Sequence, residues 1–233
     1  MAHAVVAGGG IGGLTAAVAL QRRGWSVTVC ERAPELEPVG AGIAMTPNAL
    51  AGLDAIGVGD AVRRLAAIQG PAGIRRSDGR WLVRAAMADF TARYGDPTVL
   101  LLRATLTELL AERLRPGTLH LGVTVHGADP ATGTVRTSAG ELAADLVVAA
   151  DGIRSPLRGA LFPGHPGPRY AGFTSWRVVV PRPPGPLSAA ESWGRGSVFG
   201  VMPMADDLVY CYATAVVPAG GRAADERAEL LRR

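Results

Sequence analysis

A glycine fingerprint between two predicted strands dominates the first 31 residues. Ala4–Ala7 predicts a short buried strand, and Gly8-Gly9-Gly10-Ile11-Gly12-Gly13 follows it directly. Glycine stands at all three positions of the dinucleotide-binding pattern: Gly8 for the tight turn, Gly10 for close approach of a pyrophosphate, and Gly13 for helix–strand packing. A helix over Leu14–Arg23, closed by Gly24, and a strand over Ser26–Cys30 complete the predicted βαβ unit.

Glu31 follows the second strand at the distance where this pattern places a ribose-binding acid. The helix N-terminus supplies N–H groups and a positive dipole end for phosphates. A solvated surface carboxylate is the plainer interpretation of Glu31, but its position at the strand end favours ribose binding. We therefore predict a nucleotide site formed by Gly8, Gly10, Ile11, Gly12, Gly13, Glu31 and Arg32.

Composition excludes several other classes. No apolar run approaches the ~18 residues that span a bilayer, and no basic-then-apolar leader precedes the first strand. The net charge is +4, but the arginines occur in scattered pairs without interleaved aromatic residues, which argues against nucleic acid. Two cysteines and four scattered histidines indicate neither a disulfide framework nor a metal site. We expect a cytoplasmic protein without membrane or nucleic-acid partners.

Later segments predict an α/β core with an added antiparallel sheet. Arg103–Arg115 reads as a helix, with Thr105 and Glu108 at capping-box spacing. Leu142–Ala150 reads as one apolar strand that ends at Asp151. Three alternating stretches then predict antiparallel strands: Thr174–Val180, Ser197–Met202 and Leu208–Val216.

The second informative motif is Asp151-Gly152-Ile153-Arg154-Ser155-Pro156-Leu157-Arg158. Because it follows a buried strand, Asp151 is expected at the carboxyl end of a sheet, where open α/β folds bind ligands. The stretch resembles the Asp-Gly motif of the FAD-dependent aromatic hydroxylases (para-hydroxybenzoate hydroxylase-like, group A flavoprotein monooxygenases), and it matches at Asp151, Gly152, Ser155 and Arg158. The resemblance implies that this motif contacts both flavin and the reduced nicotinamide. A cap for the following helix is the alternative role for Asp151.

Further segments are similar to the same family. Gly40–Ile43 and Pro47–Leu50, with Gly42 among them, resemble the loop beside the isoalloxazine. Arg103 resembles the arginine that meets the FAD phosphate and adenosine region, although a solvated helix residue fits equally well. Trp176-Arg177, Trp193-Gly194 and Pro203 resemble markers of the substrate-domain sheet. Arg177 fits either an anionic substrate or a solvated ion pair.

The resemblance implies a Rossmann-like FAD-binding domain with an interleaved antiparallel-sheet substrate domain. We expect residues 1–70 and 98–165 in the former, and the 71–97 hairpin and 166–233 in the latter. The family's third motif, Gly-Asp-Ala-Ala-His, has no match, because Gly59-Asp60-Ala61 comes too early and lacks the histidine. We therefore expect an N-terminal portion of a longer protein whose substrate domain is incomplete at its C-terminus.

The implied reaction uses FAD, NAD(P)H and O2 to hydroxylate a small aromatic or similar unsaturated substrate through a C4a-hydroperoxyflavin. The residues nominate no catalytic acid or base. Three alternatives stay open: a truncated FAD- or nucleotide-binding protein without monooxygenase activity of its own, an FAD-dependent epoxidase or dehydrogenase, and, most weakly, an NAD-only dehydrogenase. Substrate identity, the choice between NADH and NADPH, and oligomeric state are open at this point.

Overall fold

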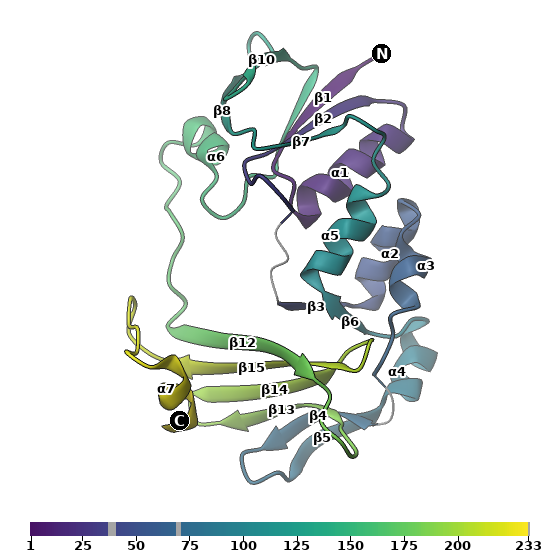
Figure 1. Ribbon diagram of the computed structural model, residues 1–233, viewed down its shortest axis with the longest axis vertical. Helices are drawn as coiled ribbons and strands as arrows, with labels where there is room; N and C mark the ends of the chain where they lie inside the picture. Colours follow the sequence, from purple (N-terminus) through teal and green to yellow (C-terminus); the bar gives the residue numbers. More distant parts are fainter. Residues whose placement is uncertain (37–40, 69–70, 233) are drawn as a thin grey trace. The chain divides into compact units, whose positions relative to one another are not determined.

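The computed structural model describes residues 1–36, 41–68 and 71–232, and the chain divides into two units (Figure 1). The first unit comprises Met1–Val39, Gly52–Gly59 and Ala104–Arg169. The second comprises Gly40–Ala51, Asp60–Arg103 and Tyr170–Arg233. Each unit is therefore assembled from chain segments that are far apart in sequence.

A four-stranded parallel sheet forms the centre of the first unit, in the order β11-β1-β2-β7. Its strands are β1 (His3–Ala7), β2 (Ser26–Glu31), β7 (Leu119–Leu121) and β11 (Leu146–Ala149). Ala4–Ala7 of β1 is almost completely buried, as expected of a central parallel strand covered on both faces. The predicted βαβ unit is confirmed, and both β1 and β11 end at the same sheet edge.

Three helices and a smaller antiparallel sheet complete this unit. The helices are α1 (Ile11–Arg22), α5 (Arg103–Ala111), whose first residue is assigned to the second unit, and α6 (Pro156–Leu161). The sheet has the order β10-β9-β8, with β8 (Val125–Asp129), β9 (Thr134–Thr137) and β10 (Gly140–Ala143).

The second unit contains a six-stranded sheet in the order β12-β15-β14-β13-β4-β5 (Figure 1). Its strands are β4 (Pro71–Arg76), β5 (Trp81–Ala86), β12 (Phe173–Pro181), β13 (Ala189–Gly194), β14 (Ser197–Pro203) and β15 (Leu208–Val216). All neighbours are antiparallel except β13 and β4. The three strands expected between residues 174 and 216 are confirmed, whereas β13 was missed.

A second, two-stranded sheet and two helices also belong to this unit. The sheet pairs β3 (Gly42–Met45) with β6 (Val99–Leu102), and the helices are α4 (Met87–Tyr94) and α7 (Glu226–Arg232). Two more helices, α2 (Pro47–Ala55) and α3 (Gly59–Arg63), run across the segment boundaries between the two units. No helix within the described ranges is long and apolar enough to cross a membrane.

Three element predictions need correction. The first helix begins at Ile11 rather than Leu14, because the glycine turn itself supplies its N-terminus. The helix expected over Arg103–Arg115 ends at Ala111, and Thr105 lies inside it, so the capping-box interpretation is wrong. The strand expected over Leu142–Ala150 is two strands, since Asp145 separates β10 from β11 and its N–H donates to the His3 carbonyl at 2.9 Å.

Candidate functional site

At two positions of the segment that joins β1 to α1, Gly8 and Gly13, backbone atoms leave no room for a Cβ. Gly8 has a φ of +108°, and a Cβ added there would lie 2.3 Å from the Ala150 carbonyl oxygen. A Cβ on Gly13 would lie 1.9 Å from the Gly8 carbonyl oxygen. Gly8 N–H donates to the Cys30 carbonyl at 2.8 Å. The turn is thus held between the ends of β11 and β2, and α1 packs directly against it.

The start of α1, unlike the positions of Gly8 and Gly13, has free space beside its glycines. A Cβ on Gly10 or Gly12 would meet no atom within 4 Å. Gly10 is the N-cap, no side chain caps the helix, and its first turn carries no acidic residue. Because the first N–H groups of a helix lack intrahelical partners, this end presents donors and a positive dipole to an open space. The arrangement fits a pyrophosphate group.

Glu31 fixes the glycine turn from the neighbouring strand. Its Oε2 accepts the Gly9 N–H at 2.6 Å, and its Oε1 accepts the Ala33 N–H at 2.9 Å. A Cβ on Gly9 would lie 2.9 Å from the Cβ of Glu31, so glycine is needed there for the carboxylate to pack closely. Each carboxylate oxygen retains acceptor capacity beyond these bonds, which a ribose hydroxyl could use.

The Asp-Gly motif forms a compact turn that begins α6. Gly152 has a φ of +85°, and Ser155 is the N-cap, whose Oγ accepts the Arg158 N–H at 2.9 Å. Asp151 Oδ2 accepts the Leu157 N–H at 3.2 Å, so the capping role considered for Asp151 is present. Arg158 Nη2 donates to the Ile153 carbonyl at 2.5 Å. Ser155 and Arg158 thereby hold the shape of the turn.

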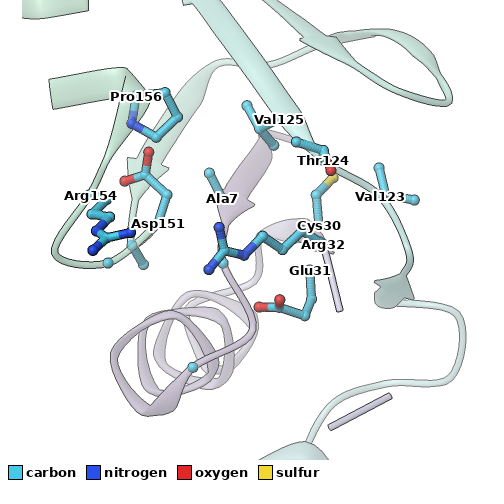
Figure 2. A pocket seen from close by; sticks show the side chains of 14 residues that line it. Ala7, Cys30, Glu31, Arg32, Val123, Thr124, Val125, Asp151, Arg154 and Pro156 are labelled. Atoms are coloured by element: carbon cyan, nitrogen blue, oxygen red, sulfur yellow. The ribbon is translucent and has the colours of Figure 1, made fainter. Parts of the chain in front are cut away.

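These two turns border one pocket of about 270 Å³ (Figure 2). It is lined by Ala7, Gly8, Gly10, Cys30, Glu31, Arg32, Val123, Thr124, Val125, Ala150, Asp151, Gly152, Arg154 and Pro156. Figure 2 shows Glu31 and Arg32 on one side of Ala7, and Asp151 and Arg154 on the other. The pocket therefore combines the open helix end with two carboxylates and two guanidinium groups.

Six of the residues predicted from sequence line this pocket: Gly8, Gly10, Glu31, Arg32, Asp151 and Gly152. Five others are not in the lining and belong to the first turn of α1 or to α6 and its N-cap: Ile11, Gly12, Gly13, Ser155 and Arg158. Arg154 was missed, although it occupies a variable position inside the Asp-Gly motif. Val123–Val125 was also missed, because only the tertiary structure brings this segment beside the pocket.

Gly42 and Arg103 belong to the second unit. Gly42 begins β3 opposite Leu102 of β6, and a Cβ on it would lie 2.7 Å from the Tyr210 ring. Arg103 N–H donates to the Ala41 carbonyl at 3.0 Å, which extends the pairing of β3 and β6 by one residue. Gly40, which the family resemblance places in the same loop, lies outside the described residues.

Two further observations define the chemistry of the first unit's pocket. Burial raises the pKa of the Cys30 thiol above its ordinary value of 9.0, so Cys30 is a neutral, apolar part of the lining. Across residues 1–36, 41–68 and 71–232, no group of three or more His, Cys, Asp or Glu side chains is placed to hold a metal ion.

Comparison with known proteins gives a consistent family. Residues 1–216 match the family model described as an FAD binding domain. The chain is similar to the aurachin C monooxygenase/isomerase of Stigmatella aurantiaca, with 41% identity over 98% of this chain and 61% of the relative. It is also similar to the FAD-dependent urate hydroxylase of Klebsiella pneumoniae, with 30% identity over 93% of this chain and 58% of the relative. The chain thus spans about three fifths of the length of these curated relatives.

The fold comparison agrees with the sequence comparison. The crystal structure of Klebsiella pneumoniae HpxO complexed with FAD and uric acid matches 99% of this chain and 61% of that chain, with a TM-score of 0.89 and 29% identity. The predicted Rossmann-like domain with an interleaved antiparallel sheet is therefore confirmed, as is the resemblance on which it was based. The chain belongs to the family of FAD binding domains.

Proposed function

We propose that this chain forms the FAD- and substrate-binding part of a monooxygenase that uses NAD(P)H and O2 to hydroxylate a small aromatic or similar unsaturated compound. The observation that carries the proposal is the pocket that joins an uncapped helix end, Glu31 and the Asp151–Gly152 turn. Relatives named as a monooxygenase/isomerase and a urate hydroxylase support the same reaction class. We further propose a cytoplasmic location.

The residues of the pocket suggest separate roles. Gly10 and the first turn of α1, including Ile11, Gly12 and Gly13, would hold the FAD pyrophosphate through backbone N–H groups. Glu31 would accept ribose hydroxyl hydrogens, and Arg32 would add positive charge beside the phosphates. Asp151 and Gly152 would meet the flavin and the nicotinamide, in a turn that Ser155 and Arg158 hold in shape.

We also propose that FAD and the substrate are bound mainly by different parts of the chain. Residues 1–70 and 98–165 would bind FAD, and residues 71–97 and 166–233 would bind the substrate. Gly42 would run beside the isoalloxazine, and Arg103 would meet the phosphate and adenosine region. When bound, FAD supplies hydride acceptance and oxygen activation, whereas this chain orients the reactants and excludes water.

The test begins with FAD retention. The purified chain is mixed with FAD, freed of excess, and its visible absorbance is measured. Retained flavin bands, followed by NAD(P)H oxidation coupled to O2 consumption and a product one oxygen heavier, would support the proposal. A colourless protein would contradict FAD binding by this chain, and NAD(P)H oxidation without oxygen incorporation would favour the dehydrogenase alternative.

Gly10→Ala sharpens this test. The added methyl meets nothing within 4 Å and Gly10 has an ordinary φ of −73°, so the fold should be unaffected, whereas a bound pyrophosphate would collide with it. We expect an unchanged thermal transition and at least about a tenfold loss of FAD affinity. Gly52→Ala is the matched control, because Gly52 also faces open space but lies in α2, outside the pocket lining.

A further inference from the structure

A buried polar contact in the first unit joins the end of α1 to the loop that precedes β7. Gln21, in the last turn of α1, and Thr118, just before β7, are both buried. Gln21 Nε2 donates to Thr118 Oγ1 at 2.7 Å, and Gln21 Oε1 accepts the Arg115 N–H at 3.1 Å. Arg115 Nη2 also donates to the Gln21 carbonyl oxygen at 3.1 Å. The side-chain amide of Gln21 thus uses both of its polar atoms to hold the 115–118 loop.

A buried amide of this kind restricts the geometry around it. An amide in a protein interior costs free energy unless its donors and acceptors are satisfied. Hydrogen bonds also require a narrow range of distance and angle, whereas apolar side chains tolerate small shifts. Gln21 therefore fixes the position of the 115–118 loop more strictly than apolar contacts alone would.

Strand β7 buries little surface of its own. It comprises three residues, lies at the edge of the parallel sheet and pairs with β2. Leu119 is half-buried, whereas His120 and Leu121 are exposed. Because a short edge strand with few buried apolar contacts opens readily, the hydrogen bonds at the two ends of β7 contribute much of what fixes its register on β2.

The start of β7 connects the Gln21 contact to β2. The Val29 N–H donates to the Thr118 carbonyl at 2.8 Å, beside the pairing of Val29 with Leu119. Thr118 is thus held on two sides, through its hydroxyl by Gln21 and through its carbonyl by β2.

The end of β7 leads directly into the pocket wall. The Gly122 N–H donates to the Ala33 carbonyl, and the Val123 N–H donates to the Glu31 carbonyl, each at 2.9 Å. The next residues of the chain, Val123–Val125, line the pocket together with Glu31. A change in the register of β7 would therefore move this wall relative to Glu31.

We propose, building on the FAD binding proposed above, that Gln21 is a positioning residue for the FAD pocket, although it does not line that pocket. The contact between Gln21 and Thr118 fixes the start of β7, and β7 in turn carries Val123–Val125 to its place beside Glu31. Loss of the contact lets β7 shift or open. The shape of the pocket then changes, although every group that lines it is still present.

The first measurement is backbone amide exchange in the chain without cofactor. Gln21→Leu keeps the approximate size of the side chain and removes its hydrogen bonds, so the Gly122 and Val123 amides should exchange at least about tenfold faster. Val18→Ala is the matched control, because Val18 is also buried in α1 and lies outside the pocket lining. It should lower the thermal transition but leave exchange at these two amides close to that of the wild type. Unchanged exchange in Gln21→Leu would overturn the inference.

The second measurement is FAD affinity. Gln21→Leu and Thr118→Val should each weaken FAD binding about fivefold, and the double variant should bind about as weakly as either single variant, because both changes break one contact. Thr118→Ser keeps the hydroxyl and should stay within about twofold of the wild type, as should Val18→Ala. Unchanged affinity in Gln21→Leu, or a loss equal to that of Val18→Ala, would make Gln21 a core residue only. Absence of FAD binding by the wild type would instead contradict the proposed function, and amide exchange alone would then decide whether Gln21 positions the wall.

Discussion

Polar groups are brought together in different ways in the four-stranded parallel sheet of the first unit and in the six-stranded sheet of the second. In the parallel sheet of the first unit, the site consists of turns at the strand ends, and each turn comes from one short stretch of chain: Gly8–Gly13 or Asp151–Arg158. In the six-stranded sheet, Tyr212 and Glu191 lie 21 positions apart and meet only through strand register. Each turn of the first unit is thus local in sequence, whereas the Tyr212–Glu191 contact depends on the pairing of three strands.

The two arrangements also differ in the atoms that they present. At the glycine turn, the helix end presents backbone N–H groups, and the glycines there leave these groups uncovered. In the six-stranded sheet, the polar contact is made by the side chains of Tyr212 and Glu191, and Gly200 of β14 provides the space for the Tyr212 ring. Both arrangements therefore depend on glycine. Gly13 lets α1 pack against the backbone of Gly8, whereas Gly200 lets the Tyr212 ring lie flat on β14.

The largest effect should follow Gly13→Ala. The new Cβ would lie 1.9 Å from the Gly8 carbonyl oxygen, which is backbone and cannot turn aside. We expect a loss of about 3 kcal/mol in the free energy of unfolding, measured by urea denaturation. Gly52→Ala should instead be neutral or stabilising by about 0.5 kcal/mol, because Gly52 is in a helix and faces open space. Equal stability of the two variants would refute the packing argument.

A smaller loss should follow Gly200→Ala, because the clash there is with a side chain. The Tyr212 ring can rotate away from the new methyl at the cost of its bond to Glu191. We expect a loss of about 2 kcal/mol in unfolding free energy. The diagnostic result is a double-mutant cycle: in a Tyr212→Ala background, Gly200→Ala should cost much less. If the cost is the same in both backgrounds, the ring is not what requires the glycine.

Local motifs account for what the sequence predicted and what it missed. The glycine turn and Glu31 were predicted because strand, turn, helix and second strand follow one another within about thirty residues. The Asp-Gly turn was predicted because eight consecutive residues resemble a family motif. Strand β13 was missed because Ala189–Gly194 is short and has no clear alternation. Trp193 was noted only as a family marker, and Glu191 was not noted at all. Their importance comes from contact with β14 and β15, which no local pattern reveals.

Ser155→Ala tests whether Ser155 stabilises the Asp-Gly turn or contacts the cofactor directly. If Ser155 acts as the α6 cap, losing its bond to the Arg158 N–H should cost about 1 kcal/mol in unfolding free energy. FAD affinity should then change by less than about threefold, since Ser155 does not line the pocket. Ser26→Ala is the control, because it removes an exposed hydroxyl from β2 in the same unit, outside the pocket lining. A large affinity loss without a stability loss would reverse the assignment and make Ser155 a cofactor contact.

The smallest effect is expected at alkaline pH, in the second unit. Burial and the Glu191 hydrogen bond raise the pKa of Tyr212 from 10.0, so above pH 10 the folded chain holds a proton that the unfolded chain has released. Unfolding then releases that proton, and the stability present below pH 10 declines as pH rises toward the raised pKa. The thiols of the buried Cys30 and the half-buried Cys211 act in the same direction from about pH 9, because burial also raises their pKa values. The measurement is therefore the difference between wild type and Tyr212→Phe in unfolding free energy from about pH 9 to 11. Tyr212→Phe should lose less stability over that range, whereas Tyr94→Phe, which removes an exposed hydroxyl from α4, should follow the wild type. If the free energy of unfolding falls equally with pH in all three proteins, Tyr212 titrates as an ordinary exposed phenol, and its contact with Glu191 is not maintained in solution.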